Sequence, residues 1–332
     1  MIDPRRTAAA VLLTSVLAAA LPFAAAGQTR EKAVFQTNWR AEAEQGGFYQ
    51  AWATGIYKKY GLDAEVRQGG PQQDPNALLI AGKVDFIMSN SFAGLNYVKG
   101  QLPFLVIATS FQKDPQVLIA HPGMGNDSLA ALKGKPIMIS AGSRTSFWPF
   151  LRARFGFTDD QIRPYTFTMA PFLANKAAIQ QGFLTNEPFQ IEKAGVTPVV
   201  LLLADAGFAN YQETINTSRE VVEKRPDYVQ RFVNASIEGW YSYLYGDPSP
   251  GNAIIKSQNP DMTDDVIAYT IKAMKERGIV DSGDSKKLGI GAMTDERWAE
   301  FYKSNVETGS FPADLDVKQA YTLNFVNKRV GM

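Results

Sequence analysis

The chain has 332 residues, and its charges nearly cancel, with 34 Lys and Arg against 33 Asp and Glu. This balance argues against a nucleic-acid partner, whose phosphates call for a basic face. The sequence has no cysteine and a single histidine. It therefore excludes disulfides, a thiolate nucleophile and any metal site built on thiolates or paired histidines, and we expect neither a metal nor a cofactor.

The first 26 residues have the pattern of a secretory signal peptide. Arg5 and Arg6 precede the apolar run Ala8–Leu21, and the small residues Ala24–Ala26 offer a cleavage site. The apolar run is too short for a comfortable membrane span, and no cysteine is present for a lipid anchor. We therefore expect a free protein exported to the periplasm, cleaved near Ala26 and long enough for two domains.

The first part of the remaining chain alternates between strand-like and helical patterns. We expect strands at 34–37, 64–67, 84–88 and 104–108, and helices at 47–60, 74–81 and 91–99. Gly61 and Gly82 follow the first two helices, as C-terminal helix stops do. This alternation predicts an α/β fold with a mainly parallel sheet covered by helices on both faces.

A second α/β unit follows, and then an almost wholly helical tail. In the second unit we expect strands at 117–120, 137–140, 165–169, 182–185 and 198–203, with helices at 126–132, 147–155, 172–180 and 188–194. After an extended segment at 211–216, we expect helices at 218–223, 226–245, 252–258, 263–277, 294–305 and 317–327. Such a tail fits if the chain crosses back and packs it on the first lobe.

The loop after the first strand is the first candidate for a ligand site. Asn38 and Trp39 end the strand, and Gly47, Phe48 and Tyr49 open the next helix. A strand that delivers a loop to a helix N-terminus is where open α/β sheets usually bind ligands. The same position after a later strand holds Ser89, Asn90 and Ser91. One of the three is expected to cap the helix, which leaves the others free to face a ligand.

Short motifs spread over nearly the whole mature chain resemble a known family. They are Asn38-Trp39, Gly46-Gly47-Phe48-Tyr49, Tyr60-Gly61-Leu62, Gly82-Lys83-Val84-Asp85-Phe86, Leu132-Lys133-Gly134-Lys135-Pro136, Thr185-Asn186-Glu187-Pro188 and Arg225-Pro226-Asp227-Tyr228. In this order and spacing they resemble the solute-binding proteins of ABC transporters, in the branch related to thiamine-pyrimidine synthases. Relatives of that branch bind taurine, alkanesulfonates and nitrate.

The resemblance implies a type II periplasmic-binding-protein fold, with two α/β lobes joined by two crossover segments near 117–121 and 204–216. The first lobe would comprise 27–117 and 206–332, including the helical C-terminal tail, and the second lobe 118–205. The ligand would lie in the cleft between the lobes, which close on it, and an inner-membrane ABC permease would be the partner. We expect a monomer.

The residues at the predicted cleft indicate the class of ligand. Aromatic rings at Trp39, Phe48, Tyr49 and Trp148 offer flat faces on which an aromatic ligand could stack. Glu187, in a turn after a strand-like run, would accept N–H donors such as an aminopyrimidine edge. The predicted ligand contacts are Asn38, Trp39, Gly47, Phe48, Tyr49, Ser89, Asn90, Ser91, Gly142, Ser143, Thr145, Trp148, Asn186 and Glu187.

Each of these readings has a structural alternative. Trp39 and Trp148 could be core aromatics, and Glu187 could be a first-turn carboxylate that faces the helix dipole. Arg40, Glu42 and Glu44 form a mixed-charge turn that is most often solvated. The lone histidine, His121, follows an apolar run and precedes Pro122, which favours a structural role over a catalytic one.

The sequence thus predicts a receptor for a small aromatic heterocycle of the thiamine-precursor pyrimidine type. A taurine, alkanesulfonate or nitrate binder is the alternative of the same class. An enzyme related to the pyrimidine synthases is the alternative of another class. Those enzymes depend on a cysteine-rich motif, a lysine and histidine chemistry, whereas this chain has no cysteine and one distant histidine. We therefore expect no enzymatic activity.

Overall fold

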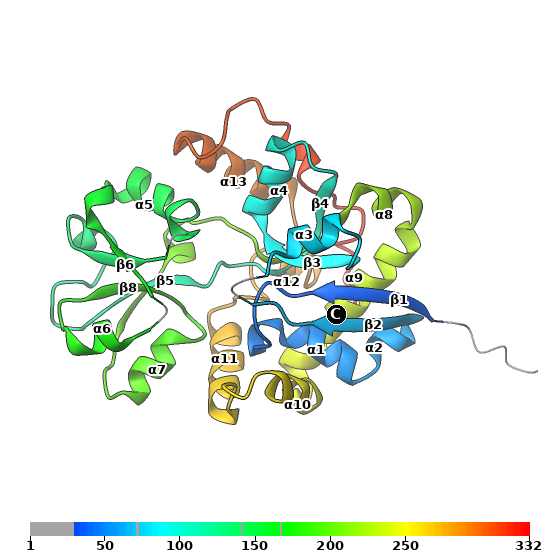
Figure 1. Ribbon diagram of the computed structural model, residues 1–332, viewed down its shortest axis with the longest axis horizontal. Coiled ribbons are helices and arrows are strands. Elements are labelled where there is room, and N and C mark those ends of the chain that lie inside the picture. Colours follow the sequence, from blue (N-terminus) through cyan, green and yellow to red (C-terminus); the bar gives the residue numbers. More distant parts are fainter. Residues whose placement is uncertain (1–29, 71–72, 141, 167) are drawn as a thin grey trace, which may run out of the picture.

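The computed structural model describes residues 30–70, 73–140, 142–166 and 168–332. The predicted signal peptide at 1–26 lies outside these residues, as does part of the predicted strand at 165–169. The chain forms two lobes side by side, each built on a five-stranded sheet (Figure 1). We call the lobe with the sheet β2-β1-β3-β10-β4 the first lobe and the lobe with the sheet β7-β6-β8-β5-β9 the second lobe. Within the described ranges, no helix has both the length and the apolar character needed to cross a membrane.

In the first lobe, one strand runs against the direction of its neighbours. The strands are β1 (Glu31–Gln36), β2 (Leu62–Arg67), β3 (Phe86–Asn90), β4 (Phe104–Phe111) and β10 (Gln212–Ser218). β1 pairs in parallel with β2 and β3, whereas β10 lies antiparallel between β3 and β4. The sheet is therefore mainly parallel, and its reversed strand is the one that the chain enters after returning from the second lobe.

The second lobe repeats this plan. Its strands are β5 (Gln116–Ala120), β6 (Ile137–Ile139), β7 (Ile162–Pro164), β8 (Ile179–Phe183) and β9 (Val199–Leu202). β6 pairs in parallel with β7 and β8, whereas β5 lies antiparallel between β8 and β9. β5 is the first strand after the chain leaves the first lobe. The reversed strand β5 overlaps the first predicted crossover segment, and β10 overlaps the end of the second.

Several predicted elements of the second lobe were misplaced. The helices are α5 (Trp148–Phe155), α6 (Ala170–Ala174) and α7 (Glu187–Lys193). The helix predicted at 172–180 ends at Ala174, and the strand β8 begins at Ile179 instead of at 182. The helix predicted at 126–132 is only a 3-10 turn at Ala130–Leu132. The preceding Asn126-Asp127-Ser128 has side chains that compete for backbone hydrogen bonds and favour turns.

The helices of the first lobe begin with α1 (Gly46–Ala53), α2 (Ile56–Lys59), α3 (Pro75–Ile80) and α4 (Ser91–Lys99). The single helix predicted at 47–60 is broken at Gly55, whose φ of 77° is left-handed. The tail adds α8 (Arg219–Lys224), α9 (Pro226–Tyr245), α10 (Ser249–Gln258), α11 (Asp264–Glu276), α12 (Ser285–Leu288) and α13 (Asp295–Glu307).

The last predicted helix, at 317–327, was wrong. Apart from a 3-10 turn at Val317–Gln319, this segment is irregular, and Tyr321 forms a bridge with Val106 of β4. Its apolar residues, including Phe325 and Val326, are buried nonetheless. Their spacing therefore reflects a segment that covers the first sheet, and not one face of a helix.

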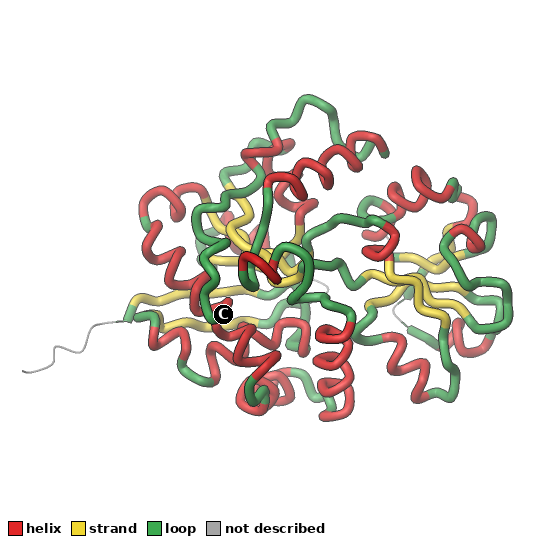
Figure 2. The backbone as a smooth tube through the Cα atoms, turned by 180° about the vertical axis from the view of Figure 1, so that it is seen from behind, coloured by secondary structure: helices red, strands yellow, loops and turns green. Residues whose placement is uncertain are grey.

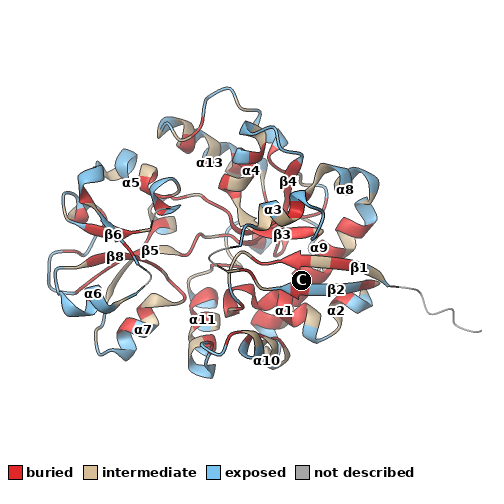
Figure 3. Cartoon of the chain, viewed as in Figure 1, coloured by how far each residue is buried: buried red, intermediate tan, exposed pale blue. Residues whose placement is uncertain are grey.

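The core of the first lobe is aromatic and lies between the sheet and α9 (Figure 3). On α9, the ring of Phe232 stacks on Phe86 of β3, with 4.0 Å between centroids and 6° between planes. Trp240, two turns further along α9, packs edge-on against Phe48 of α1 and Phe111 of β4. These contacts join the C-terminal tail to the first lobe, as predicted, and they explain why α9 has a wide apolar face.

Candidate ligand site between the lobes

The first-lobe side of the candidate site is the edge where β1 and β3 end and β10 begins. Asn38 lies just past β1, and Gln212 pairs with Asn90 at the end of β3. The Asn38 side-chain amide donates a hydrogen bond to Oε1 of Glu213, over 3.4 Å. Since the carboxyl ends of parallel strands form the usual ligand edge of such sheets, this pair lies where a ligand is expected.

Three of the predicted contacts belong to the core of the first lobe instead. Gly47, Phe48 and Tyr49 are all buried in α1. A Cβ on Gly47 would overlap the ring of Trp240, so this glycine permits the close approach of α1 and α9. The Phe48 ring lies 4.5 Å from that of Phe35, and the Tyr49 hydroxyl donates to Gln258. These residues shape the lobe beneath the site but do not present surfaces to a ligand in this structure.

Trp39, by contrast, lies in a partly buried loop that is firmly held. Its carbonyl accepts hydrogen bonds from the Thr37 hydroxyl and from the Gly69 amide, both over 2.7 Å. A Cβ on Gly69 would overlap the Thr37 carbonyl, so the loops after β1 and β2 meet at their backbones. Trp39 therefore has a fixed position at the ligand edge, and its contact with a ligand stays a prediction.

The Ser89–Ser91 segment was expected to cap the helix with one residue and leave two for a ligand, but two of the three have structural contacts. Asn90 caps α4 by accepting a hydrogen bond from the amide of Ala93. Ser91 is buried, and its hydroxyl accepts a 3.0 Å hydrogen bond from the amide of Tyr211, just before β10. The two residues thus fix the helix and the returning crossover strand, and partly exposed Ser89 is the one of the three left for a ligand.

On the second lobe, the loop after β6 is organised around Gln181. The Gln181 side-chain oxygen accepts from the amide of Ser140 and from the hydroxyl of buried Ser143. Gly142 and Thr145 are exposed, and the Thr145 hydroxyl donates back to the Gly142 carbonyl. Ser143 is therefore a structural residue here, whereas Gly142 and Thr145 remain available on the surface.

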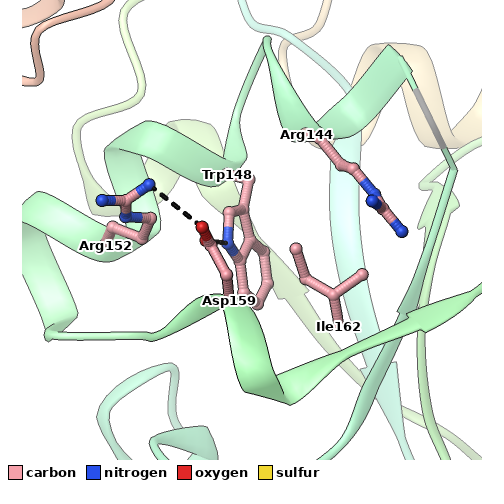
Figure 4. A pocket seen from close by; sticks show the side chains of 5 residues that line it. All are labelled: Arg144, Trp148, Arg152, Asp159 and Ile162. Atoms are coloured by element: carbon pink, nitrogen blue, oxygen red, sulfur yellow. Dashed lines mark hydrogen bonds and ion pairs between the residues drawn. The ribbon is translucent and has the colours of Figure 1, made fainter.

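Trp148 lies in the core of the second lobe. Its ring is 1% exposed, and its indole N–H donates to Asp159 over 3.0 Å. Figure 4 shows the Trp148 ring between Arg152 and Arg144, at a small pocket that is also lined by Asp159 and Ile162. Every residue of this pocket comes from the second lobe, so the expectation that Trp148 stacks on a ligand between the lobes is not supported by its position.

Glu187 also has a different role from the one predicted. Its Oε2 accepts the amide of Phe183 over 2.7 Å, and its Oε1 accepts the Tyr165 hydroxyl over 3.2 Å. Burial raises the pKa of Glu187, and these donors only partly oppose it. Both oxygens thus hold the turn that starts α7, where Asn186 is the residue before the helix. The carboxyl group is already satisfied by its own lobe.

The second-lobe turn that holds Glu187 nevertheless contacts the first lobe. Thr185, just before it, donates from its hydroxyl to Oε1 of Glu44 across the lobes, over 2.6 Å. On α11, the Thr270 hydroxyl donates to the Thr185 carbonyl and the Tyr269 hydroxyl to the Leu184 carbonyl. The lobes therefore touch through hydrogen bonds that are buried or partly buried. Figure 2 shows the two lobes from behind.

The first-lobe side of this contact is unexpectedly acidic. Glu44 is buried, where a solvated turn had been predicted, and only Arg40 of that turn is exposed. Burial raises the pKa of Glu44 to about 7, and Glu187 adds to the shift. The pKa of Glu42 is raised well above its usual range by burial and by Glu44, Glu187 and Glu213. Four carboxyl groups from both lobes thus act on one another at this contact.

The most informative residue that the sequence reasoning missed is Glu213. It is 2% exposed, and burial raises its pKa to about 8, with Glu44 and Asp114 contributing. A signal was present in the sequence, since Glu213 is the only charged residue between Ala206 and Ser218. A lone charge in an otherwise uncharged crossover strand needs a reason to be there.

His121 was expected to be structural, and its contacts agree with that role. The ring is buried, stacks on Phe172 at 4.2 Å and bonds the Phe172 carbonyl through Nε2. Among the described residues, no group of three or more His, Asp or Glu side chains is placed to hold a metal ion.

Comparison with known proteins shows which family this chain belongs to. The family model described as NMT1/THI5 like matches residues 42–250. The riboflavin-binding protein RibY of Chloroflexus aurantiacus is 23% identical over 285 residues, which cover 84% of this chain and 79% of that protein.

Solved structures share the fold at low identity. The aliphatic sulphonate binding protein SsuA of Escherichia coli superposes with a TM-score of 0.67 at 14% identity, covering 87% of this chain and 91% of that chain. The desulfurization enzyme DSZB gives a TM-score of 0.60 at 11% identity, covering 89% and 97%. The predicted fold class is thereby confirmed. The chain belongs to the NMT1/THI5-like family, and it has the fold of periplasmic solute-binding proteins.

Proposed function

We propose that this protein is an extracytoplasmic receptor that binds a small aromatic heterocycle of the thiamine-precursor pyrimidine type between its lobes. It would act as an exported monomer and deliver the ligand to an inner-membrane ABC permease. Membership of the NMT1/THI5-like family and the two-lobed fold support the receptor class. The observation that carries the ligand class is the gathering of carboxyl groups at the contact between the lobes.

These carboxyl groups favour a ligand with N–H donors over an anion. Glu44 and Glu213 are buried. Glu187 raises the pKa of Glu44, and both Glu44 and Glu213 raise the pKa of Glu42. A sulfonate placed among them would be repelled by any ionised carboxylate and would find few donors. Arg40, the cation nearest in sequence, is exposed and lies 3.8 Å from Asp261 at the surface.

A sulfonate binder remains the second candidate, because solved structures of sulfonate-binding proteins share the fold. At 14% and 12% identity they support the fold, and the ligand of each belongs to that protein. The riboflavin-binding relative points instead to a flat nitrogen heterocycle. Together with the acidic contact, this decides our preference.

The receptor would signal that a ligand is bound by closing its lobes. The bond from Thr185 to Glu44 and the stacking of Phe189 on Tyr269, 4.8 Å apart, join the second lobe to the first. A ligand that contacts both lobes stabilises the closed state over the open one, and only that difference drives closure. The permease would then read the closed form.

Calorimetry separates the two candidate ligand classes. We expect a hydroxymethyl-aminopyrimidine to bind with micromolar or tighter affinity and taurine to produce no measurable heat. Trp39→Ala should weaken pyrimidine binding, because an aromatic pair is worth about 0.5–1.5 kcal/mol beyond the area it buries. Tight taurine binding by the wild-type protein, with no binding of the pyrimidine, would overturn the proposal.

A further inference from the structure

Glu213 occupies an unusual backbone position at the start of β10. Gln212 and Thr214 pair with the consecutive residues Asn90 and Ser89 of β3, so Glu213 is the extra residue of a β-bulge. Its φ is 54°, in the left-handed region that a glutamate adopts only at an energetic cost. The bulge lies in β10, between β3 and β4, within hydrogen-bond distance of Asn38, which lies just past β1. Such bulges re-aim side chains beside functional sites.

Two polar atoms at this bulge have no partner. Asn38 donates to Oε1 of Glu213, which leaves Oε2 of Glu213 and Oδ1 of Asn38 buried without a hydrogen bond. A buried polar atom without a partner is costly, and such atoms are rare in native proteins. Both atoms belong to the same hydrogen-bonded pair of side chains.

The groups around Glu213 favour its protonated form. Glu44 and Asp114 raise its pKa along with burial, and the Asn38 and Gln212 amides oppose the shift only partly. Glu42, on the adjacent loop, also interacts with it. The nearby cations act on other carboxyl groups, Arg297 on Asp114 and Arg40 on Glu42. When Glu213 is protonated and its Oε1 accepts from Asn38, the proton on Oε2 makes that oxygen a donor.

We propose that Asn38 and Glu213 form a subsite that reads the edge of a ligand where a ring nitrogen lies beside an amino group. Oε2–H of Glu213 donates to the ring nitrogen, and Oδ1 of Asn38 accepts from the amino group. This assignment rests on the proposed function and deepens it, because it names the ligand edge and the two atoms that recognise it. A neutral carboxylic acid that donates a hydrogen bond in a buried site has precedent in enzymes.

Substitutions at Glu213 test the donor role. Glu213→Gln keeps a donor, so it should bind a hydroxymethyl-aminopyrimidine within about threefold of the wild type at pH 7. Glu213→Gly suits the left-handed backbone and should fold with an unchanged or raised Tm, yet lose about tenfold to a hundredfold in affinity. Asn38→Ala should lose a similar factor. Glu223→Gln, an exposed change on α8, is the matched control and should bind like the wild type.

The pH profile gives a readout that a structural role would not move. Wild-type affinity should fall above pH 8, by about tenfold per unit, as Oε2 loses its proton. Glu213→Gln should abolish that fall, and the same pyrimidine without its amino group should bind weakly to both proteins.

Three results would overturn the subsite. They are full affinity in Glu213→Gly, a loss in Glu213→Gln as large as in Glu213→Gly, or the same alkaline fall in Glu213→Gln as in the wild type. If the wild-type protein binds taurine and not the aminopyrimidine, the proposed function is wrong, and the subsite proposal that rests on it is wrong as well. If it binds the aminopyrimidine and the Glu213 variants match it, only the subsite fails.

Discussion

The individual carboxyl groups at the lobe contact have different tasks. Glu187 was the acceptor that the sequence favoured, yet both of its oxygens are engaged by Phe183 and Tyr165 of its own lobe. Glu213 has one oxygen free at the first-lobe edge. The side chain that looked functional in the sequence thus holds a turn, and the one that looked like part of a strand has a buried oxygen without a hydrogen bond.

Glu187→Ala should therefore lower stability more than it lowers affinity. It leaves the Phe183 amide without its partner in a largely buried turn, which costs about 1–3 kcal/mol. We expect a clear drop in the midpoint of urea unfolding, measured by far-UV circular dichroism. Trp39→Ala, in the same assay, should change the midpoint little because Trp39 is only partly buried. Equal midpoints for Glu187→Ala and the wild type would contradict this reading.

Thr185 carries the contact between the lobes. Thr185→Val keeps the shape of the side chain but removes the donor that Glu44 uses. Closing the lobes would then bury the Glu44 carboxyl without that partner, so we expect ligand affinity to fall about tenfold. Affinity can be measured by tryptophan fluorescence, with Thr197→Val, an exposed second-lobe residue before β9, as the control. An unchanged affinity would show that closure does not use this bond.

At the level of elements, α1 depends on α9 for its packing. Gly47 faces the Trp240 ring so closely that an added methyl group would overlap it. Gly47→Ala should therefore destabilise the protein by about 1–3 kcal/mol, as overpacked cores do. Thermal unfolding would show this as a lowered Tm, whereas Gly142→Ala, with open space around its Cβ, should unfold like the wild type. If both variants melt together, α1 and α9 are packed less tightly than described.

The alternating pattern of strands and helices was enough to predict two α/β lobes and the helical tail on the first lobe. The pattern did not show the direction of each strand or which side chains pack together. Neither β5 nor β10 reveals in its own residues that it runs against its neighbours, because period-two patterning is the same both ways. Phe48 looked like a ligand face, since its partner Trp240 lies almost two hundred positions away. Segment 317–327 shows the same limit of the sequence pattern. Its apolar residues have the spacing of a helix, but most of the segment is irregular.

The molecule as a whole should be more stable in mild acid than in mild alkali. The pKa values of Glu44, Glu213 and Asp114 are raised in the folded state to about 7, 8 and 6, by burial above all. Between about pH 4.5 and 8 the folded state thus binds more protons than the unfolded state, so the free energy of unfolding falls as pH rises. These groups contribute their full stabilisation at pH values below their pKa in the unfolded state. They lose it as the pH rises through their pKa in the folded state.

We therefore expect Tm to decrease from pH 5.5 to pH 8.5, with a change in the free energy of unfolding on the order of a few kcal/mol. Differential scanning calorimetry of the ligand-free protein checks this. Glu213→Gln removes one of the three groups, so its Tm should depend less steeply on pH. A Tm that rises over this range would mean that these carboxyl groups are ionised at little cost in the folded protein.

The antiparallel strand β10 also sets an order of assembly. The first sheet is completed only when residues 212–218 enter between β3 and β4, and by then the whole second lobe has been synthesised. The second sheet, in contrast, is built from one uninterrupted stretch between Gln116 and Leu202. The second lobe, although later in the chain, can thus fold first. Until β10 is added, the edges of β3 and β4 in the first lobe stay unpaired and are open to mispairing or to chaperones.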